Sequence, residues 1–210
     1  MSHPSSPEDL VLHAVRLLGV ATSDDVAARF GLGSSEAGEI LLDDQAYGWV
    51  SYSEFAGAGG WSLTERGRVE NERRLRTELD GVARGRSAVE AVHADFLPCN
   101  ARLQQACTDW QITPSPGRPL AVNDHSDPRW DALVIYQLGR LADDLAPLAA
   151  RLTSVLARFA GYDGRFAAAV DRARAGDSTA VIGRDRTTCH AVWFELHEDL
   201  IATLGLARTS

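Results

Sequence analysis

The sequence predicts a mainly α-helical protein in two parts. Three observations indicate this. Apolar residues follow helical spacing in most segments, only residues 49–64 alternate as strands do, and four of the eight prolines lie between residues 113 and 128. The sequence changes character near residue 81. We therefore expect one domain over residues 1–80 and a second, a bundle of four or five helices, over residues 81–210.

Three short helices are expected before residue 48. Ser6 can cap the first, Pro7 fits its first helical position, and its apolar stripe ends at Gly19. The other two helices are delimited by residues typical of helix ends, one over residues 22–30 and one from Ser34 or Ser35 to Tyr47.

A hairpin and a fourth helix are expected to follow. Residues 49–53 alternate as a strand does, residues 56–60 form a glycine-rich tip, and residues 61–64 return as a short strand. Thr64 can then cap an arginine- and glutamate-rich helix over residues 65–79. Three helices, a two-stranded hairpin and another helix are the element order of a winged helix-turn-helix domain, in which the hairpin is the wing.

One stretch supports this interpretation. Gly60-Trp61-Ser62-Leu63-Thr64-Glu65-Arg66-Gly67-Arg68 resembles the aromatic-x-Leu-Thr-x-x-Gly-Arg stretch that closes the wing in many bacterial winged-helix regulators, including the multiple-antibiotic-resistance type. The resemblance covers about the first 80 residues. It implies a bacterial transcription regulator that binds double-stranded DNA, with the third helix in the major groove and the wing near the backbone. The residues expected to contact DNA are Arg29, Ser34, Ser35, Gln45, Arg66 and Arg68.

The charge distribution opposes this reading. The chain has a net charge of −8, and residues 1–80 hold seven arginines against 14 acidic residues. Contacts between basic side chains and phosphates supply most non-specific DNA affinity. In the third helix Glu36, Glu39 and Asp43 share one face. If that face points outward, the domain is better explained by the alternative hypothesis, a protein-interaction module that does not bind DNA.

The second part is expected to contain long helices, and we recognise no family in it. The predicted helices cover residues 87–110, 129 to about 159 with an interruption or restart at Pro147, 165–175, and 185–206. Residues 113–128 are too rich in proline for a regular element. We expect this part to sense a small-molecule effector and to form a homodimer.

Polar and aromatic residues in the second part form candidate effector sites. They combine hydrogen-bonding side chains with large rings, as ligand pockets do. The candidates are His93, Asn100, Trp110, Asp124, His125, His190, Trp193 and His197.

A third hypothesis is a small-ligand or metal-binding enzyme that uses His190, His197, Glu198 and the Asp124-His125 loop. The sequence contains no recognised metal-ligand spacing, phosphate-binding loop or nucleophile elbow. We therefore predict neither catalysis nor a metal or other cofactor.

Composition limits the remaining classes. The three cysteines are too few and too scattered for a disulfide framework, and no apolar run approaches the roughly 20 residues of a transmembrane helix. We expect a cytoplasmic protein with no membrane partner.

Overall fold

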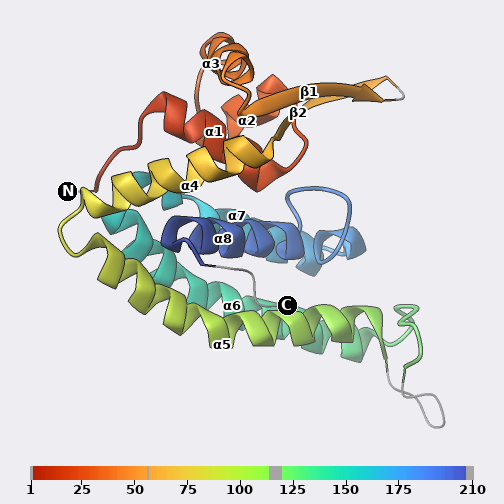
Figure 1. Cartoon of the computed structure of the whole chain (residues 1–210). Coiled ribbons are helices and arrows are strands. Elements are labelled where there is room, and N and C mark those ends of the chain that lie inside the picture. Colours follow the sequence, from red (N-terminus) through yellow and green to blue (C-terminus); the bar gives the residue numbers. More distant parts are fainter. Residues whose placement is uncertain (1, 56, 114–119, 207–210) are drawn as a thin grey trace. The chain divides into compact units, whose positions relative to one another are not determined.

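A computed structural model of the chain describes residues 2–55, 57–113 and 120–206. Over these residues it confirms a mainly helical fold with one antiparallel pair of strands (Figure 1). In chain order the elements are α1 (Pro7–Leu18), α2 (Ser23–Phe30), α3 (Ser34–Ala46), β1 (Val50–Phe55), β2 (Ala58–Leu63), α4 (Glu65–Asp80), α5 (Gly85–Gln111), α6 (Pro128–Val155), η1 (Ala157–Phe159), α7 (Tyr162–Arg174), η2 (Ser178–Ala180) and α8 (Cys189–Leu204), where η is a 3-10 helix. None of the described helices has both the length and the apolarity that crossing a membrane requires.

The chain divides into two compact units that do not follow the sequence order strictly. Unit 1 consists of Met1–Ser87, Ser154–Arg158 and Glu198–Ser210, and unit 2 of Ala88–Thr153 and Phe159–His197. Unit 1 therefore includes two segments from the last third of the sequence. The change of composition near residue 81 gives no indication of them.

The helix ends of unit 1 follow from local capping. Ser6 Oγ accepts a hydrogen bond from the Asp9 amide at 3.2 Å, and Thr22 and Asp25 form a reciprocal capping box at the start of α2. Thr64 Oγ1 accepts from the Gly67 amide at 3.0 Å and caps α4. These side chains satisfy amide groups that a helix N-terminus otherwise leaves unpaired.

The hairpin is held against the helices of unit 1 by Trp61. In the register of β1 and β2, Tyr52 is opposite Trp61. Trp61 exchanges two backbone hydrogen bonds with Ala21, and its indole Nε1 donates to Ser23 Oγ at 3.0 Å. The two strands extend well beyond this anchor (Figure 1). The base of the hairpin therefore has a defined position against α1 and α2.

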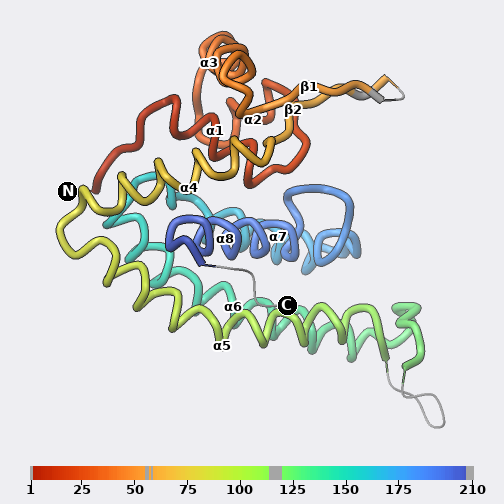
Figure 2. Tube along the Cα trace, viewed as in Figure 1, coloured from red at the N-terminus to blue at the C-terminus, as the bar shows by residue number. Residues whose placement is uncertain are grey.

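In unit 2, α5 and α6 run side by side in opposite directions (Figures 1 and 2). Two ion pairs join them: Arg102 Nη1 lies 2.6 Å from Asp144 Oδ2, and Arg151 Nη1 lies 2.6 Å from Asp95 Oδ2. Because the residue number rises on one helix as it falls on the other, the two pairs fix an antiparallel register.

Several predicted boundaries are corrected by the structure. α6 is continuous through Pro147 and ends at Val155, although a proline inside a helix removes one backbone hydrogen bond. The proline ring is exposed, and the buried Leu145 and Leu148 hold the helix on both sides.

Two further helices and the hairpin also differ from prediction. α7 begins earlier, at Tyr162, and α8 spans Cys189–Leu204 rather than residues 185–206. β2 already begins at Ala58, inside the predicted tip. The tip residue Ala56 and residues 114–119 of the predicted irregular segment lie outside the described residues.

Candidate functional site

The outward face of α3 is acidic. Glu36, Glu39 and Asp43 are all exposed, as are the predicted contact residues Ser34, Ser35 and Gln45, and the helix contains no basic residue. Ala37 and Leu41, on the opposite face, are fully buried in the core of unit 1. The burial of Ala37 and Leu41 therefore fixes which face of α3 points to solvent, and that face carries the carboxylates.

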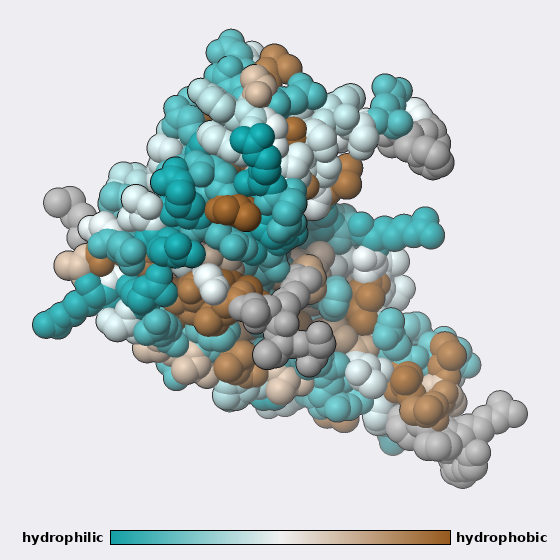
Figure 3. All heavy atoms as spheres, viewed as in Figure 1, coloured by the Kyte–Doolittle hydropathy of each residue, from teal (hydrophilic) through white to brown (hydrophobic). Residues whose placement is uncertain are grey.

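Exposed apolar side chains accompany these carboxylates. Leu42 is 59% exposed and Tyr47, which follows the last turn of α3, is 60% exposed. The Tyr47 ring stacks on Trp49 with 4.5 Å between centroids, and the Arg74 guanidinium covers Trp49 at 4.6 Å. In Figure 3 the surface of α3 mixes hydrophilic residues with a few hydrophobic ones, whereas α4 is mostly hydrophilic.

Asp44 follows Asp43 in the sequence but lies on the buried face of α3, with Ala37 and Leu41. Its side-chain Oδ2 has no hydrogen-bond partner, and the residue is only 3% exposed. Burial raises the pKa of Asp44 to about 7, although the positive charge of Arg74 opposes the rise. Asp44 is thus a carboxyl group whose burial penalises the charged form near neutral pH.

The described hairpin residues carry no basic side chain. Ser51, Tyr52, Ser53 and Glu54 are exposed on β1, and the described part of β2 contains only small, apolar and hydroxyl side chains. The nearest exposed cations follow the hairpin on the first turn of α4: these are Arg66 and Arg68. Arg68 Nη1 lies 4.0 Å from Glu198 Oε1, so part of its charge is already compensated.

The remaining predicted DNA-contact residue, Arg29, is half-buried. Its guanidinium carbon lies 4.4 Å from the centroid of the Phe30 ring. The Nη2 atom of this guanidinium is buried, whereas Ser34 and Gln45 are exposed.

The residues of the wing-closing stretch have structural roles. Thr64 caps α4 and also donates its hydroxyl hydrogen to the Gly48 carbonyl at 2.7 Å. A Cβ added to Gly67 would lie 1.8 Å from the Trp49 carbonyl oxygen, so only glycine fits there. The Leu-Thr-x-x-Gly pattern is thus explained by a tight junction between hairpin and helix.

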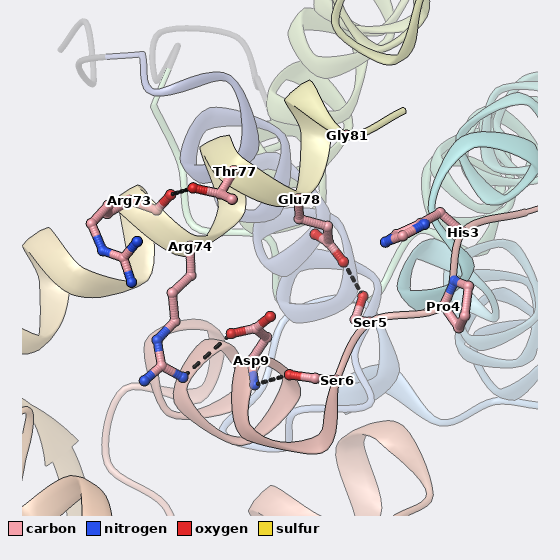
Figure 4. Close-up of a pocket in the computed structure, with 10 residues that line it drawn as sticks. All are labelled: His3, Pro4, Ser5, Ser6, Asp9, Arg73, Arg74, Thr77, Glu78 and Gly81. Atoms are coloured by element: carbon pink, nitrogen blue, oxygen red, sulfur yellow. Dashed lines mark hydrogen bonds and ion pairs between the residues drawn. The ribbon is translucent and has the colours of Figure 1, made fainter. Parts of the chain in front are cut away.

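A depression of about 550 Å³ lies between the N-terminal segment and α4. Figure 4 shows Arg74 directed toward Asp9, which it binds at 3.3 Å, and Ser5 directed toward Glu78, which it also binds. Arg73 makes two hydrogen bonds of 2.8 Å to Glu70. Because these charges are paired within the chain, the depression offers little unused charge for a ligand.

A buried ionic network connects α1 and α4 with the C-terminal segments of unit 1. Asp199 binds Arg158 and lies 3.0 Å from His13 Nε2. Arg158 also donates to Glu78 Oε2 at 3.1 Å and to Thr203 Oγ1 at 2.7 Å. Burial alone would raise the pKa of Asp199, but the charge of Arg158 and the interaction with His13 hold it below its usual value.

No pattern in the sequence predicted this network. His13 is fully buried within the apolar stripe of α1, and a histidine in such a stripe was the available signal. Its partners Arg158 and Asp199 are more than 140 residues away in sequence, so no local pattern identifies them.

Four of the predicted effector residues come together between α5 and α8 of unit 2. The Trp193 indole Nε1 donates to Asn100 Oδ1 at 3.1 Å, and the rings of His93 and His197 lie 6.3 Å apart. Phe96 contacts both Trp193 and His197. Burial lowers the pKa of His93, which favours the neutral imidazole.

Trp110 and His125 form a separate cluster in the same unit. His125 Nδ1 lies 3.0 Å from Asp131 Oδ2, its ring packs 4.6 Å from that of Trp110, and its backbone is left-handed with φ of 60°. Asn123 fixes Asp131 through a hydrogen bond of 3.0 Å. Asp124 is exposed beside this cluster.

His190, the last predicted effector residue, is exposed on α8 and stacks with Phe194. Among the described residues, no group of three or more histidine, cysteine, aspartate or glutamate side chains could hold a metal ion. Burial raises the pKa of the Cys107 thiol to about 11 and that of Cys189 to about 12, so both thiols stay protonated at neutral pH.

The chain matched no protein-family model, and its comparison with curated proteins and with solved structures gave no match either.

Proposed function

We propose that unit 1 is a recognition module of the winged-helix type that binds a basic segment of a partner protein on the outer face of α3. One observation carries the proposal: Glu36, Glu39 and Asp43 are exposed together on a helix without a single cation. A surface of this charge attracts arginine- and lysine-rich partners and repels phosphates.

Apolar side chains next to the carboxylates define the partner further. Leu42 and Tyr47 are each more than half exposed. Aromatic and large apolar side chains are the common anchors of protein interfaces, surrounded by polar groups that set orientation. The partner segment is therefore amphipathic, with basic side chains for the carboxylates and apolar side chains for Leu42 and Tyr47.

The winged-helix part of the proposal rests on order and local geometry. α1, α2 and α3 precede the hairpin, α4 follows it, and Trp61 ties the hairpin to the loop between α1 and α2. Fold alone does not determine function, so the surface of α3 decides between the hypotheses.

The proposal is tested by fluorescence anisotropy with a labelled helical peptide that carries arginine on one face and leucine on the other. We expect the variant Glu36→Gln/Glu39→Gln/Asp43→Asn to weaken peptide binding about tenfold or more at physiological ionic strength. A matched control removes three exposed carboxylates elsewhere in unit 1, as Asp24→Asn/Glu54→Gln/Glu65→Gln. Equal weakening in both variants would show that the peptide responds only to overall charge and would refute the α3 site.

Duplex DNA is the second candidate ligand, favoured by Arg66 and Arg68, both exposed directly after the hairpin. In this case unit 2 is the effector-sensing and dimer-forming part of a regulator, with the Asn100–Trp193 pair at its effector site. The same assay with a labelled duplex separates the candidates. If DNA binds at physiological salt and Arg66→Ala/Arg68→Ala weakens binding and flattens its salt dependence, the protein-binding proposal is replaced by this one.

A further inference from the structure

The outer face of α6 is a long exposed surface with apolar residues in its middle. Leu133 is 49% exposed and Tyr136 is 65% exposed, and Arg129, Arg140 and Asp143 are exposed on the same side of the helix. At 100° per residue, all five positions fall within about 60° of the direction of Tyr136. They therefore form one continuous stripe, which we name the α6 face.

The charges of the α6 face differ from those that α6 directs toward α5. Asp144 and Arg151, which α6 directs toward α5, are each paired at 2.6 Å. Within the part of the chain that the structure describes, the side chains of Arg129, Arg140 and Asp143 form no ion pair. The stripe thus combines exposed apolar groups with charges that no described residue pairs.

We infer that this face binds the same face of a second copy, antiparallel, about a two-fold axis at Tyr136. Arg129 and Asp143 lie seven positions before and after Tyr136. An antiparallel partner therefore places Arg129 of each copy opposite Asp143 of the other, so two ion pairs form by symmetry. The contact spans about 21 Å of helix.

The charges select this register over the two nearest alternatives. Placing Leu133 opposite Tyr136 of the second copy would bring Arg129 against Arg140, which is a repulsive contact. Placing Arg140 opposite Asp143 would put the four charges at the centre and Tyr136 at the edge. Interfaces have the reverse arrangement, with an apolar centre and a polar rim, which the axis at Tyr136 reproduces.

The inference is independent of what unit 1 binds, and sedimentation equilibrium of the full chain tests it. We expect a concentration-dependent dimer with micromolar affinity, because a contact along a single pair of helices is small. Tyr136→Glu should abolish it. Arg129→Asp and Asp143→Arg should each weaken it about tenfold, and the double variant should return to within about threefold of the original affinity.

Arg140→Asp serves as the matched control, since Arg140 lies opposite Ala132 of the second copy in this register. It should change the affinity less than about threefold. Circular dichroism shows whether each variant keeps its helical content. A chain that is monomeric at every concentration overturns the inference. A dimer that Tyr136→Glu leaves intact also overturns the inference. The same holds if Arg140→Asp/Asp143→Arg restores the affinity and Arg129→Asp/Asp143→Arg does not.

Discussion

Replacing Asp44 with asparagine is expected to stabilise the protein increasingly as the pH rises from about 5.5 to 8.5. Asp44 is 3% exposed, its Oδ2 has no partner, and burial raises its pKa to about 7 from the usual 3.8. The charge of Arg74 works against the rise, while Asp43, Glu70 and Glu8 add to it. Asparagine keeps the shape of the side chain but cannot ionise.

The sign follows from proton linkage. Between pH 3.8 and about 7 the unfolded chain releases the Asp44 proton while the folded protein keeps it, so stability falls as the pH rises. Above about 7 the loss is complete. A pKa difference of about 3, at 1.36 kcal/mol for each pKa step, gives a total of about 4 kcal/mol, of which about 2 kcal/mol falls above pH 5.5.

Urea unfolding, followed by circular dichroism at several pH values, measures this effect. The free energy of unfolding of Asp44→Asn minus that of the original protein should grow by about 2 kcal/mol between pH 5.5 and 8.5. Gln45→Ala, which changes an exposed side chain that cannot ionise at the next position, should show a nearly constant difference. A constant difference for Asp44→Asn as well would show that this carboxyl is ionised in the folded protein, and the reasoning from burial would be wrong.

Three further substitutions test the packing of unit 1. Gly67→Ala should destabilise the protein by about 3 kcal/mol or more, because its Cβ would overlap the Trp49 carbonyl. Gly38→Ala places its Cβ where no atom lies within 4 Å, so it should stabilise the protein by about 0.5–1 kcal/mol. Thermal unfolding compares the two, and equal effects would contradict the tight junction. Arg158→Met should cost about 3–5 kcal/mol in urea unfolding because the buried Asp199 and Glu78 both lose the arginine that they bind. A loss below about 1 kcal/mol would mean that water reaches the network.

Local sequence signals predicted most elements because their causes are local. Ser6, Thr22 and Thr64 each cap a helix with their own side chains, and the structure contains all three caps. Pro147 is the counterexample. Its local effect is to break a helix, but packing on both sides keeps α6 continuous.

The candidate sites were less predictable because they depend on which residues the tertiary packing buries and which it brings into contact. Sequence spacing placed Glu36, Glu39 and Asp43 on one face of a helix but could not say whether that face is buried. Ala37 and Leu41 decide this by entering the core. Asp44, next to Asp43, gave no sign that it is buried, since burial depends on the helices packed around it.

By itself the sequence determined the mainly helical fold, the hairpin, the capped starts of α1, α2 and α4 and the acidic stripe of α3, since each follows from neighbours a few residues apart. Only the tertiary structure decided that His13, Arg158 and Asp199 form one buried network, because such contacts join segments that no short-range pattern relates. The same holds for the α6 face. Its charges are exposed, whereas Asp144 and Arg151 of the same helix are paired with α5.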